Sequence, residues 1–184
     1  SETIVFEPRL KGEVFSCETT VQGWKLTDFR MFLSKIEVNQ NPVDLLPQGL
    51  WQTKDVALLD FENGSGSCEN GDSMINDQIQ VSTKLYKGDV LSFDIGVPFE
   101  FNHSNPVKNS GPLRNMSMHW SWRSGYKFIR LGAKSPEGAH WSFHLGSTQC
   151  LGEMTDVEKC LYPNRARAEV VVVDPKNPIL LNLD

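Results

Sequence analysis

Short segments of alternating hydrophobicity, separated by turn-forming residues, run through the whole chain, and they restrict the fold more than any other feature. The clearest segment is 28–39, in which successive side chains point to opposite faces of a strand. One face carries Phe29, Met31 and Leu33, and the other carries Arg30, Phe32 and Ser34. The other segments of this kind are 3–10, 55–63, 77–85, 89–101, 118–133, 140–147, 165–174 and 178–184.

Turn chemistry separates these segments, in NQNP, ENGSGSCENGD, YKGD, SNPVKNSGP, SPEG and DPKNP. No convincing amphipathic helix is present, although a short helix or turn is expected in GEMTDVEKC and around 44–50. About nine short strands with this punctuation predict an all-β protein, an antiparallel β-sandwich. Because there is no internal repeat or low-complexity linker, we expect a single domain over 1–184.

Four cysteines, Cys17, Cys68, Cys150 and Cys160, bear on the compartment. None belongs to a C-x-x-C pair, so a zinc knuckle or a thioredoxin-type motif is not expected. Cys150 and Cys160 flank the loop LGEMTDVEK, whose closure by a disulfide is sterically reasonable, and Cys17–Cys68 is then the second disulfide. Two disulfides indicate the periplasm or the cell surface, and four separate buried thiols are the alternative.

Charge, hydropathy and motif content exclude several classes of function. The formal net charge is −5 with a pI of about 5.4, and Lys and Arg are scattered, so no basic stripe for a nucleic acid is present. No run approaches the roughly 18 apolar residues of a membrane span. The chain also lacks G-x-S-x-G, H-E-x-x-H and a phosphate-binding glycine loop, so we expect no enzyme activity.

The four histidines are possible metal ligands: His103, His119, His140 and His144. His103 follows VPFEFN, where a strand gives way to a loop, and His144 precedes a Gly-Ser turn in SFHLGS. Function is often carried by the loops at the end of a sandwich, although either residue could simply belong to a turn. His140, in the turn SPEGAH, is expected to be solvated.

Two methionines, a histidine and two tryptophans lie between Met116 and Trp122. Strand alternation would place both tryptophans and both methionines on one face and His119 on the other. In a purely structural interpretation, Trp120 and Trp122 form a buried face and methionine fills gaps, which leaves open whether His119 is simply exposed. Imidazole and thioether donors without nearby carboxylates instead favour copper over a hard cation.

The acidic segment LDFENGSGSCENGDS is a competing cation site. Its oxygen donors, which could bind calcium, are Asp60, Glu62, Asn63, Asn70 and Asp72. The segment fails the D-x-D-x-D-G pattern, so a solvated loop is the better interpretation.

Three further elements occur in order: GVPFEFNHSNP, GPLRNMSMHWSWRSGYKFIRLGA and HWSFHLGSTQC. They resemble the MbnP-like family, and within it the branch named for a metallo-mystery pair system with a four-cysteine motif. That branch shows VPF-x-x-NH-x-x-P, PL…M-x-W-x-W-x-x-GYKF-x-R and FHLGSTGC, with Gln149 here in place of the last glycine. The resemblance covers most of Thr3–Cys160, and the methanotroph copper proteins MopE and CorA are similar at a greater distance.

The resemblance implies a secreted or periplasmic sandwich that binds copper, often Cu(I), through histidines. It also implies a partner that resembles the di-haem peroxidases of the MauG and MbnH type. By position, His103 and His144 are the first-choice ligands, and His119 ranks third because its position varies in the motif. Trp120 and Trp122 are the candidates for oxidation to kynurenine, or for lining the site if unmodified.

These observations predict a copper-binding protein for copper acquisition, buffering or delivery. A ligand-binding, carbohydrate-type sandwich is the main alternative, in which Trp24, Trp51 or Trp141 would stack on sugar rings. An adhesin or assembly module without chemistry and a redox enzyme that uses bound copper are the remaining alternatives.

Overall fold

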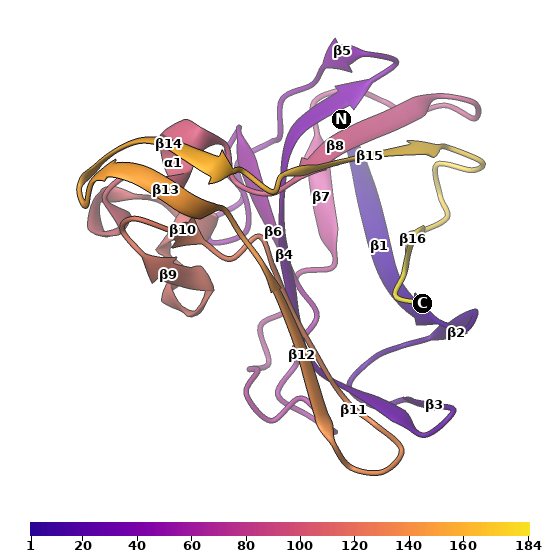
Figure 1. Ribbon diagram of the computed structural model, residues 1–184. Coiled ribbons are helices and arrows are strands. Elements are labelled where there is room, and N and C mark those ends of the chain that lie inside the picture. Colours follow the sequence, from indigo (N-terminus) through magenta and orange to yellow (C-terminus); the bar gives the residue numbers. More distant parts are fainter.

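The 15-residue strand β4 (Trp24–Val38) runs through the whole of the larger sheet. The structure is a computed structural model that describes residues 1–184 (Figure 1). The larger sheet has the order β12-β11-β4-β8-β15, and β3, β5 and β6 also pair with β4. Its strands are β3 (Thr20–Val21), β4, β5 (Asn41–Pro42), β6 (Val56–Asp60), β8 (Val90–Ile95), β11 (Ile129–Lys134), β12 (His140–Leu145) and β15 (Ala166–Val171).

The second sheet lies opposite, as Figure 1 shows for β1 and β16. It consists of β1 (Glu2–Leu10), β2 (Glu13–Val14), β7 (Gln78–Val81) and β16 (Ile179–Asn182). Pairing between strands is antiparallel, except that β16 runs parallel to β1. The predicted antiparallel β-sandwich is confirmed, and we call its two sheets the body.

The two faces of β4 contact different cores, as the alternation in 28–39 predicts. Phe29, Met31 and Leu33 belong to a main cluster of 22 buried residues between the sheets. On the opposite face, Phe32 belongs to a second cluster of eight, which includes Tyr126. The second cluster joins the larger sheet to the irregular part of the chain.

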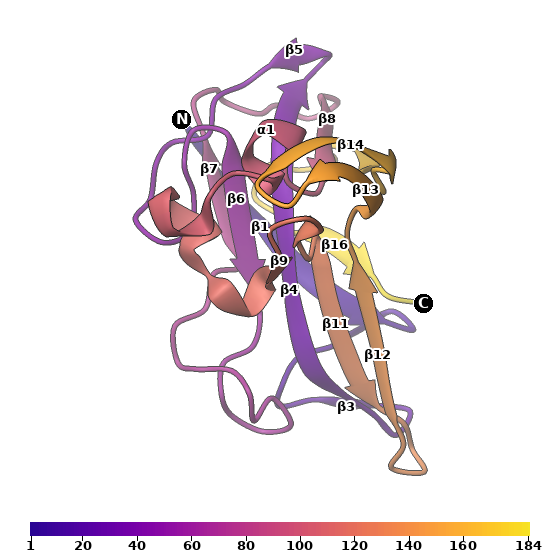
Figure 2. The same ribbon diagram turned by 60° about the vertical axis from the view of Figure 1, so that its left-hand side comes forward.

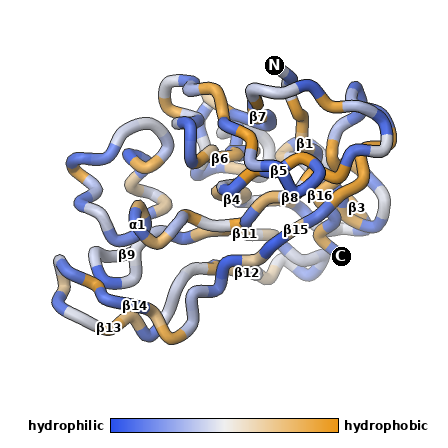
Figure 3. Tube along the Cα trace, turned by 90° about the horizontal axis from the view of Figure 1, so that it is seen from above, coloured by the Kyte–Doolittle hydropathy of each residue, from blue (hydrophilic) through white to orange (hydrophobic).

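That irregular part, residues 99–126, together with the hairpin of β13 and β14, is called here the loop lobe. Its elements are α1 (Phe99–Asn102), the 3-10 turns η1 (Pro106–Lys108), η2 (Gly111–Arg114) and η3 (Met116–Met118), and the strands β9 (His119–Ser121), β10 (Gly125–Tyr126), β13 (Thr148–Glu153) and β14 (Asp156–Tyr162). Figure 2 shows β13 and β14 beside α1 and β9, and Figure 3 shows this group projecting from one side of the body.

Several local predictions are met only in part within or beside the loop lobe. Of the short helix or turn expected in GEMTDVEKC (152–160), only the turn is present, at the tip of a β-hairpin, and 44–50 likewise contains a turn and isolated bridges but no helix. The expected strand 89–101 ends at Ile95, because Pro98 begins the turn of helix α1. The expected strand 118–133 is divided into β9, β10 and β11.

All helices of the structure are short, with at most four residues. None has the length and hydrophobicity that a membrane-spanning helix requires.

Candidate metal centre

Both predicted disulfides are present, in very different surroundings. Cys17–Cys68 joins segments 51 residues apart and is part of the main core, where both cysteines are buried. Cys150–Cys160 joins directly paired residues of β13 and β14, only ten residues apart. Cys160 is half-buried, so the second disulfide lies at the edge of the loop lobe.

His103 directly follows α1 and faces the Cys150–Cys160 disulfide. Its Nε2 lies 3.4 Å from Sγ of Cys160, and the Phe99 ring lies 4.9 Å away, centroid to centroid. The side-chain amide nitrogen of Asn102 lies 3.3 Å from the same Nε2. Nδ1 of His103 is buried and has no hydrogen-bond partner. The imidazole is therefore held on three sides, and its Nδ1 has no well-aligned hydrogen bond, although backbone carbonyls of Trp122 and Arg123 lie near the ring.

Asn102 fixes the position of His103 through a hydrogen bond to the hairpin of β9 and β10. It is fully buried, and its Oδ1 accepts a 2.8 Å hydrogen bond from the backbone N–H of Tyr126. The neighbouring Gly125 has φ +77°, and a Cβ there would lie 2.4 Å from two oxygens of Asn102. Glycine is thus required at 125 both for the backbone conformation and for the close approach to Asn102. These two requirements explain the glycine at the start of the GYKF motif.

Burial favours the neutral form of His103. Desolvation lowers the pKa of His103 below its ordinary value of 6.5, and the Arg165 guanidinium adds to this effect. Nearby backbone carbonyls of Trp122 and Arg123 oppose it. A neutral imidazole is the form that binds a metal ion.

His119 lies in β9 against the ring of Tyr126, edge to face, with centroids 5.0 Å apart. It is half-buried, its Nε2 is buried without a hydrogen-bond partner, and burial lowers its pKa. The exposure of His119, which the sequence left open, is thus partial. The 3-10 turn η3 interrupts the alternation just before this residue, so the faces expected for 116–122 do not apply.

The tryptophans of the same segment are correspondingly less buried than expected. Trp120 is 41% exposed, and its ring lies 6.2 Å from that of His144, centroid to centroid. A Cβ on Gly146 would lie 2.6 Å from the Trp120 ring, so glycine lets the indole lie against the chain at the end of β12. Trp122 is half-buried.

His144 is exposed, and burial lowers its pKa, with smaller effects of Lys127 and Arg130.

The three candidate histidines lie in or beside the loop lobe, but they do not converge on one point. The only group of three or more His, Cys, Asp or Glu side chains with ligand atoms within 4.8 Å of one another is His103 with Cys150 and Cys160. Those sulfurs form a disulfide and are not free thiolates. Neither His119 nor His144 belongs to the group. Of the three histidines, only His103 therefore lies in a cluster of potential metal ligands.

Sequence reasoning missed the position of this disulfide beside His103. The two groups are 57 residues apart in the chain, so no local spacing could reveal the contact. A weaker signal was Gln149, where the motif has glycine. Gln149 adopts φ +52°, a conformation that favours glycine, at the point where β13 leads into Cys150.

Two of the oxygen donors of the acidic segment, Asp60 and Glu62, lie against Arg30 instead of an open cation site. Asp60 accepts a 2.9 Å hydrogen bond from Nε of Arg30 and another from the backbone of Glu62. Arg30 also lies 3.6 Å from a carboxylate oxygen of Glu62. The buried guanidinium of Arg30 thus neutralises these carboxylates. No residue of this segment belongs to the cluster of potential metal ligands around His103.

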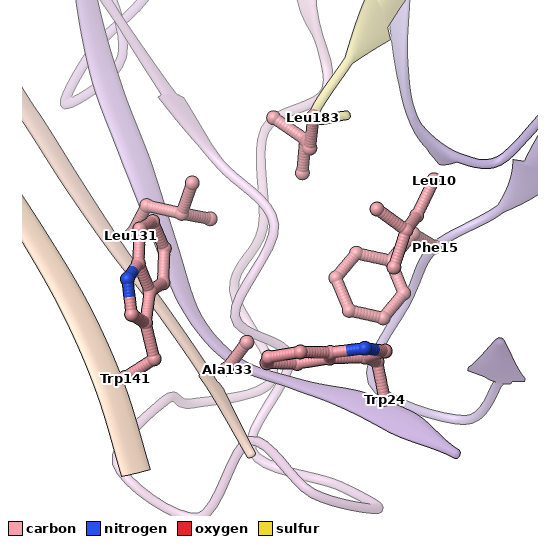
Figure 4. A pocket seen from close by; sticks show the side chains of 7 residues that line it. All are labelled: Leu10, Phe15, Trp24, Leu131, Ala133, Trp141 and Leu183. Atoms are coloured by element: carbon pink, nitrogen blue, oxygen red, sulfur yellow. The ribbon is translucent and has the colours of Figure 1, made fainter. Parts of the chain in front are cut away.

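Trp24 and Trp141 face a different feature, a pocket of about 210 Å³ between the sheets (Figure 4). It is lined by Leu10, Phe15, Trp24, Leu131, Ala133, Trp141 and Leu183. All seven are hydrophobic, whereas a sugar needs polar partners for its hydroxyl groups. This pocket does not favour the carbohydrate alternative.

Comparison with known proteins places the whole chain in one family. No curated protein matches it. The solved structure of MbnP from Methylosinus trichosporium shares the fold, with a TM-score of 0.78 at 23% sequence identity over 99% of this chain and 75% of that one. The model of the MbnP family matches residues 1–184, and the chain therefore belongs to the MbnP family.

Proposed function

We propose that the protein binds one copper ion in the loop lobe, outside the cytoplasm, and serves in copper acquisition, buffering or delivery without catalysing a reaction. The family is linked to methanobactin systems, which supports a copper-related role. The two disulfides support an oxidising compartment.

The observation that carries the proposal is a pair of half-buried imidazoles in the loop lobe. Nδ1 of His103 and Nε2 of His119 are buried without a hydrogen-bond partner. Buried polar atoms are nearly always paired in folded proteins, so the unpaired Nε2 of His119 supports the binding of a further group in this lobe. His103 offers its lone pair at Nε2, the nitrogen that faces the amide nitrogen of Asn102. Imidazole suits copper, and no carboxylate belongs to the group around His103, so the donor set fits a soft or borderline ion.

In this proposal His103 is the primary ligand, and His119 and His144 are the candidates to complete the site. All three have a lowered pKa, chiefly through burial, and are therefore neutral at pH 7. Copper binding should then persist to a lower pH than ordinary histidines with a pKa of about 6.5 would allow.

A copper titration of the oxidised, metal-free protein tests the proposal. Wild type should bind about one copper per chain, and His103→Ala should weaken binding at least tenfold. His140→Ala is the matched control, because His140 is exposed and lies at the far end of β12. His119→Ala and His144→Ala identify the second ligand. Unchanged affinity in His103→Ala, with an intact fold by circular dichroism, contradicts the proposal.

We also propose that Trp120 or Trp122 is oxidised to kynurenine by a di-haem peroxidase of the MauG and MbnH type. Trp120 is accessible, with its ring beside His144, and the backbone of Trp122 lies next to His103, so both positions are near candidate copper ligands. Peptide mass spectrometry of protein co-produced with such a peroxidase should find a modified residue at 120 or 122. Unmodified tryptophan at both positions refutes this part and leaves copper binding intact.

A further inference from the structure

The corner where His103 meets the Cys150–Cys160 disulfide has a second possible chemistry. The Sγ atoms of both cysteines and a ring nitrogen of His103 lie within 4.8 Å of one another. As a disulfide, the sulfurs are poor ligands, because thiolate is the form that binds metal ions. We propose that reduction of Cys150–Cys160 creates a three-ligand site, His103 with two thiolates, for a thiophilic cation such as Zn(II) or Cu(I).

The hydrogen bonds of Asn102 direct the correct histidine nitrogen at the sulfurs. Because Oδ1 of Asn102 accepts from the N–H of Tyr126, the amide nitrogen is the atom that faces His103. That amide nitrogen can only donate, so Nε2 of His103 carries the lone pair. The same Nε2 lies 3.4 Å from Sγ of Cys160. The ligand atom therefore already lies beside the disulfide before any reduction, and a bound metal ion would replace the Asn102 amide as its partner.

The hairpin should keep both thiols in place after reduction. Cys150 and Cys160 are direct cross-strand partners, and the ladder of β13 and β14 continues on both sides of them, from Thr148–Tyr162 to Glu153–Asp156. The backbone of Gly152 also accepts a 3.2 Å hydrogen bond from Arg123, which ties the hairpin to the rest of the loop lobe. Metal–sulfur bonds of about 2.3 Å in a tetrahedral site put two sulfurs roughly 3.8 Å apart, a separation that side-chain rotation can supply.

The two disulfides differ in accessibility, so reduction can be selective. Cys68 and Cys17 are both buried in the core, whereas the second disulfide joins Cys150, which is 7% exposed, to the half-buried Cys160 on a projecting hairpin. A dithiol reductant would attack the accessible sulfur, form a mixed disulfide and leave as a cyclic disulfide, with two electrons passing to Cys150 and Cys160 as two thiols. Metal binding then releases the thiol protons. Three protein ligands leave a fourth position open for water or for a group of a partner.

Cobalt titration of the selectively reduced protein tests this inference. The protein is treated with dithiothreitol and desalted without oxygen. A parallel sample is alkylated for peptide mapping, which should find Cys150 and Cys160 reduced and Cys17–Cys68 intact. Added Co(II) should then give a thiolate-to-cobalt charge-transfer absorption at one Co(II) per chain, and Zn(II) should abolish it. The oxidised protein and a Cys150→Ser, Cys160→Ser variant should show no such band.

Histidine variants separate a three-ligand site from two thiols acting alone. Reduced His103→Ala should bind Co(II) at least tenfold more weakly than wild type, while His140→Ala should bind as wild type does. No band in reduced wild type, equal affinity in His103→Ala, or reduction of Cys17–Cys68 before Cys150–Cys160 would each overturn the inference. It shares His103 with the proposed copper site but does not require it, because copper uptake by the oxidised protein is measured separately.

Discussion

The body and the loop lobe differ in what they contribute: the body contains most of the hydrophobic core, and the loop lobe contains the candidate metal ligands His103 and His119. In the body, two sheets bury a continuous core of 22 residues, and the disulfide Cys17–Cys68 is part of that core. In the loop lobe, short turns and two-stranded hairpins rest on a cluster of eight buried residues, and the imidazoles of His103 and His119, each with one nitrogen that lacks a hydrogen-bond partner, are held there. The comparison teaches that stability and metal binding should be separable by mutation.

The largest expected effect is in the body, at Phe6. This side chain is 1% exposed and packs edge to face on Phe93, with centroids 5.9 Å apart. Phe6→Ala should lower the free energy of unfolding by about 3–5 kcal/mol, because the cavity cannot collapse between two sheets. Urea denaturation measures the loss, and copper affinity below the unfolding transition should be unchanged. A large loss of copper affinity in the folded variant would mean that the two regions are not separable.

Glu62, a buried polar residue that follows β6 beside the body, gives the next largest effect. Its carboxylate is fully buried, neither oxygen has a hydrogen-bond partner, and burial raises its pKa from 4.5 to about 7 despite the opposing effect of Arg30. The folded protein therefore keeps a proton that the unfolded chain releases. The resulting stabilisation is complete below pH 4.5 and is lost as the pH rises through 7.

Glu62→Gln should remove this pH dependence, because a neutral amide does not ionise. At pH 8 the variant should be more stable than wild type by up to roughly 3 kcal/mol, and at pH 5 the difference should be much smaller. Urea denaturation at both pH values measures this, with Glu69→Gln, an exposed residue of the same segment, as the control. Parallel pH profiles for wild type and Glu62→Gln would show that Glu62 titrates normally.

The smallest effect is the difference between the two disulfides. By loop-closure entropy, replacing Cys17 and Cys68 with serine should cost about 4 kcal/mol, and replacing Cys150 and Cys160 about 2.7 kcal/mol. The loops span 51 and ten residues, and the shorter one is also held by strand pairing. Chemical denaturation of the two double variants measures the gap. The reverse order of stabilities would show that the loop lobe, rather than the body, depends on its disulfide.

The sequence predicted the body well because its strands have a period. In 28–39 the alternation separates Leu33 from Phe32, and the structure puts these residues in different cores. The cysteine pairs were also predicted correctly. The short loop between Cys150 and Cys160 indicated the first pair, and Cys17 and Cys68 then remained for the second.

The loop lobe has no such period, and apart from its disulfide its local structure was not predicted. The turn η3 ends at Met118 and breaks the strand alternation on which the expected faces of His119 and Trp120 depend. GEMTDVEKC is rich in helix formers, yet pairing of Cys150 with Cys160 and φ +111° at Gly152 make it a hairpin. His103 was found through the resemblance of its motif, but its contact with a disulfide 57 residues away depends on the folded structure.

The position of the bound copper tests the central claim most directly. Anomalous scattering at the copper edge, from crystals of the oxidised and copper-loaded protein, should give a single strong peak in the loop lobe, about 2 Å from a ring nitrogen of His103. A peak at His140, in the acidic segment 60–72 or in the apolar pocket between the sheets, with none at His103, would contradict the account.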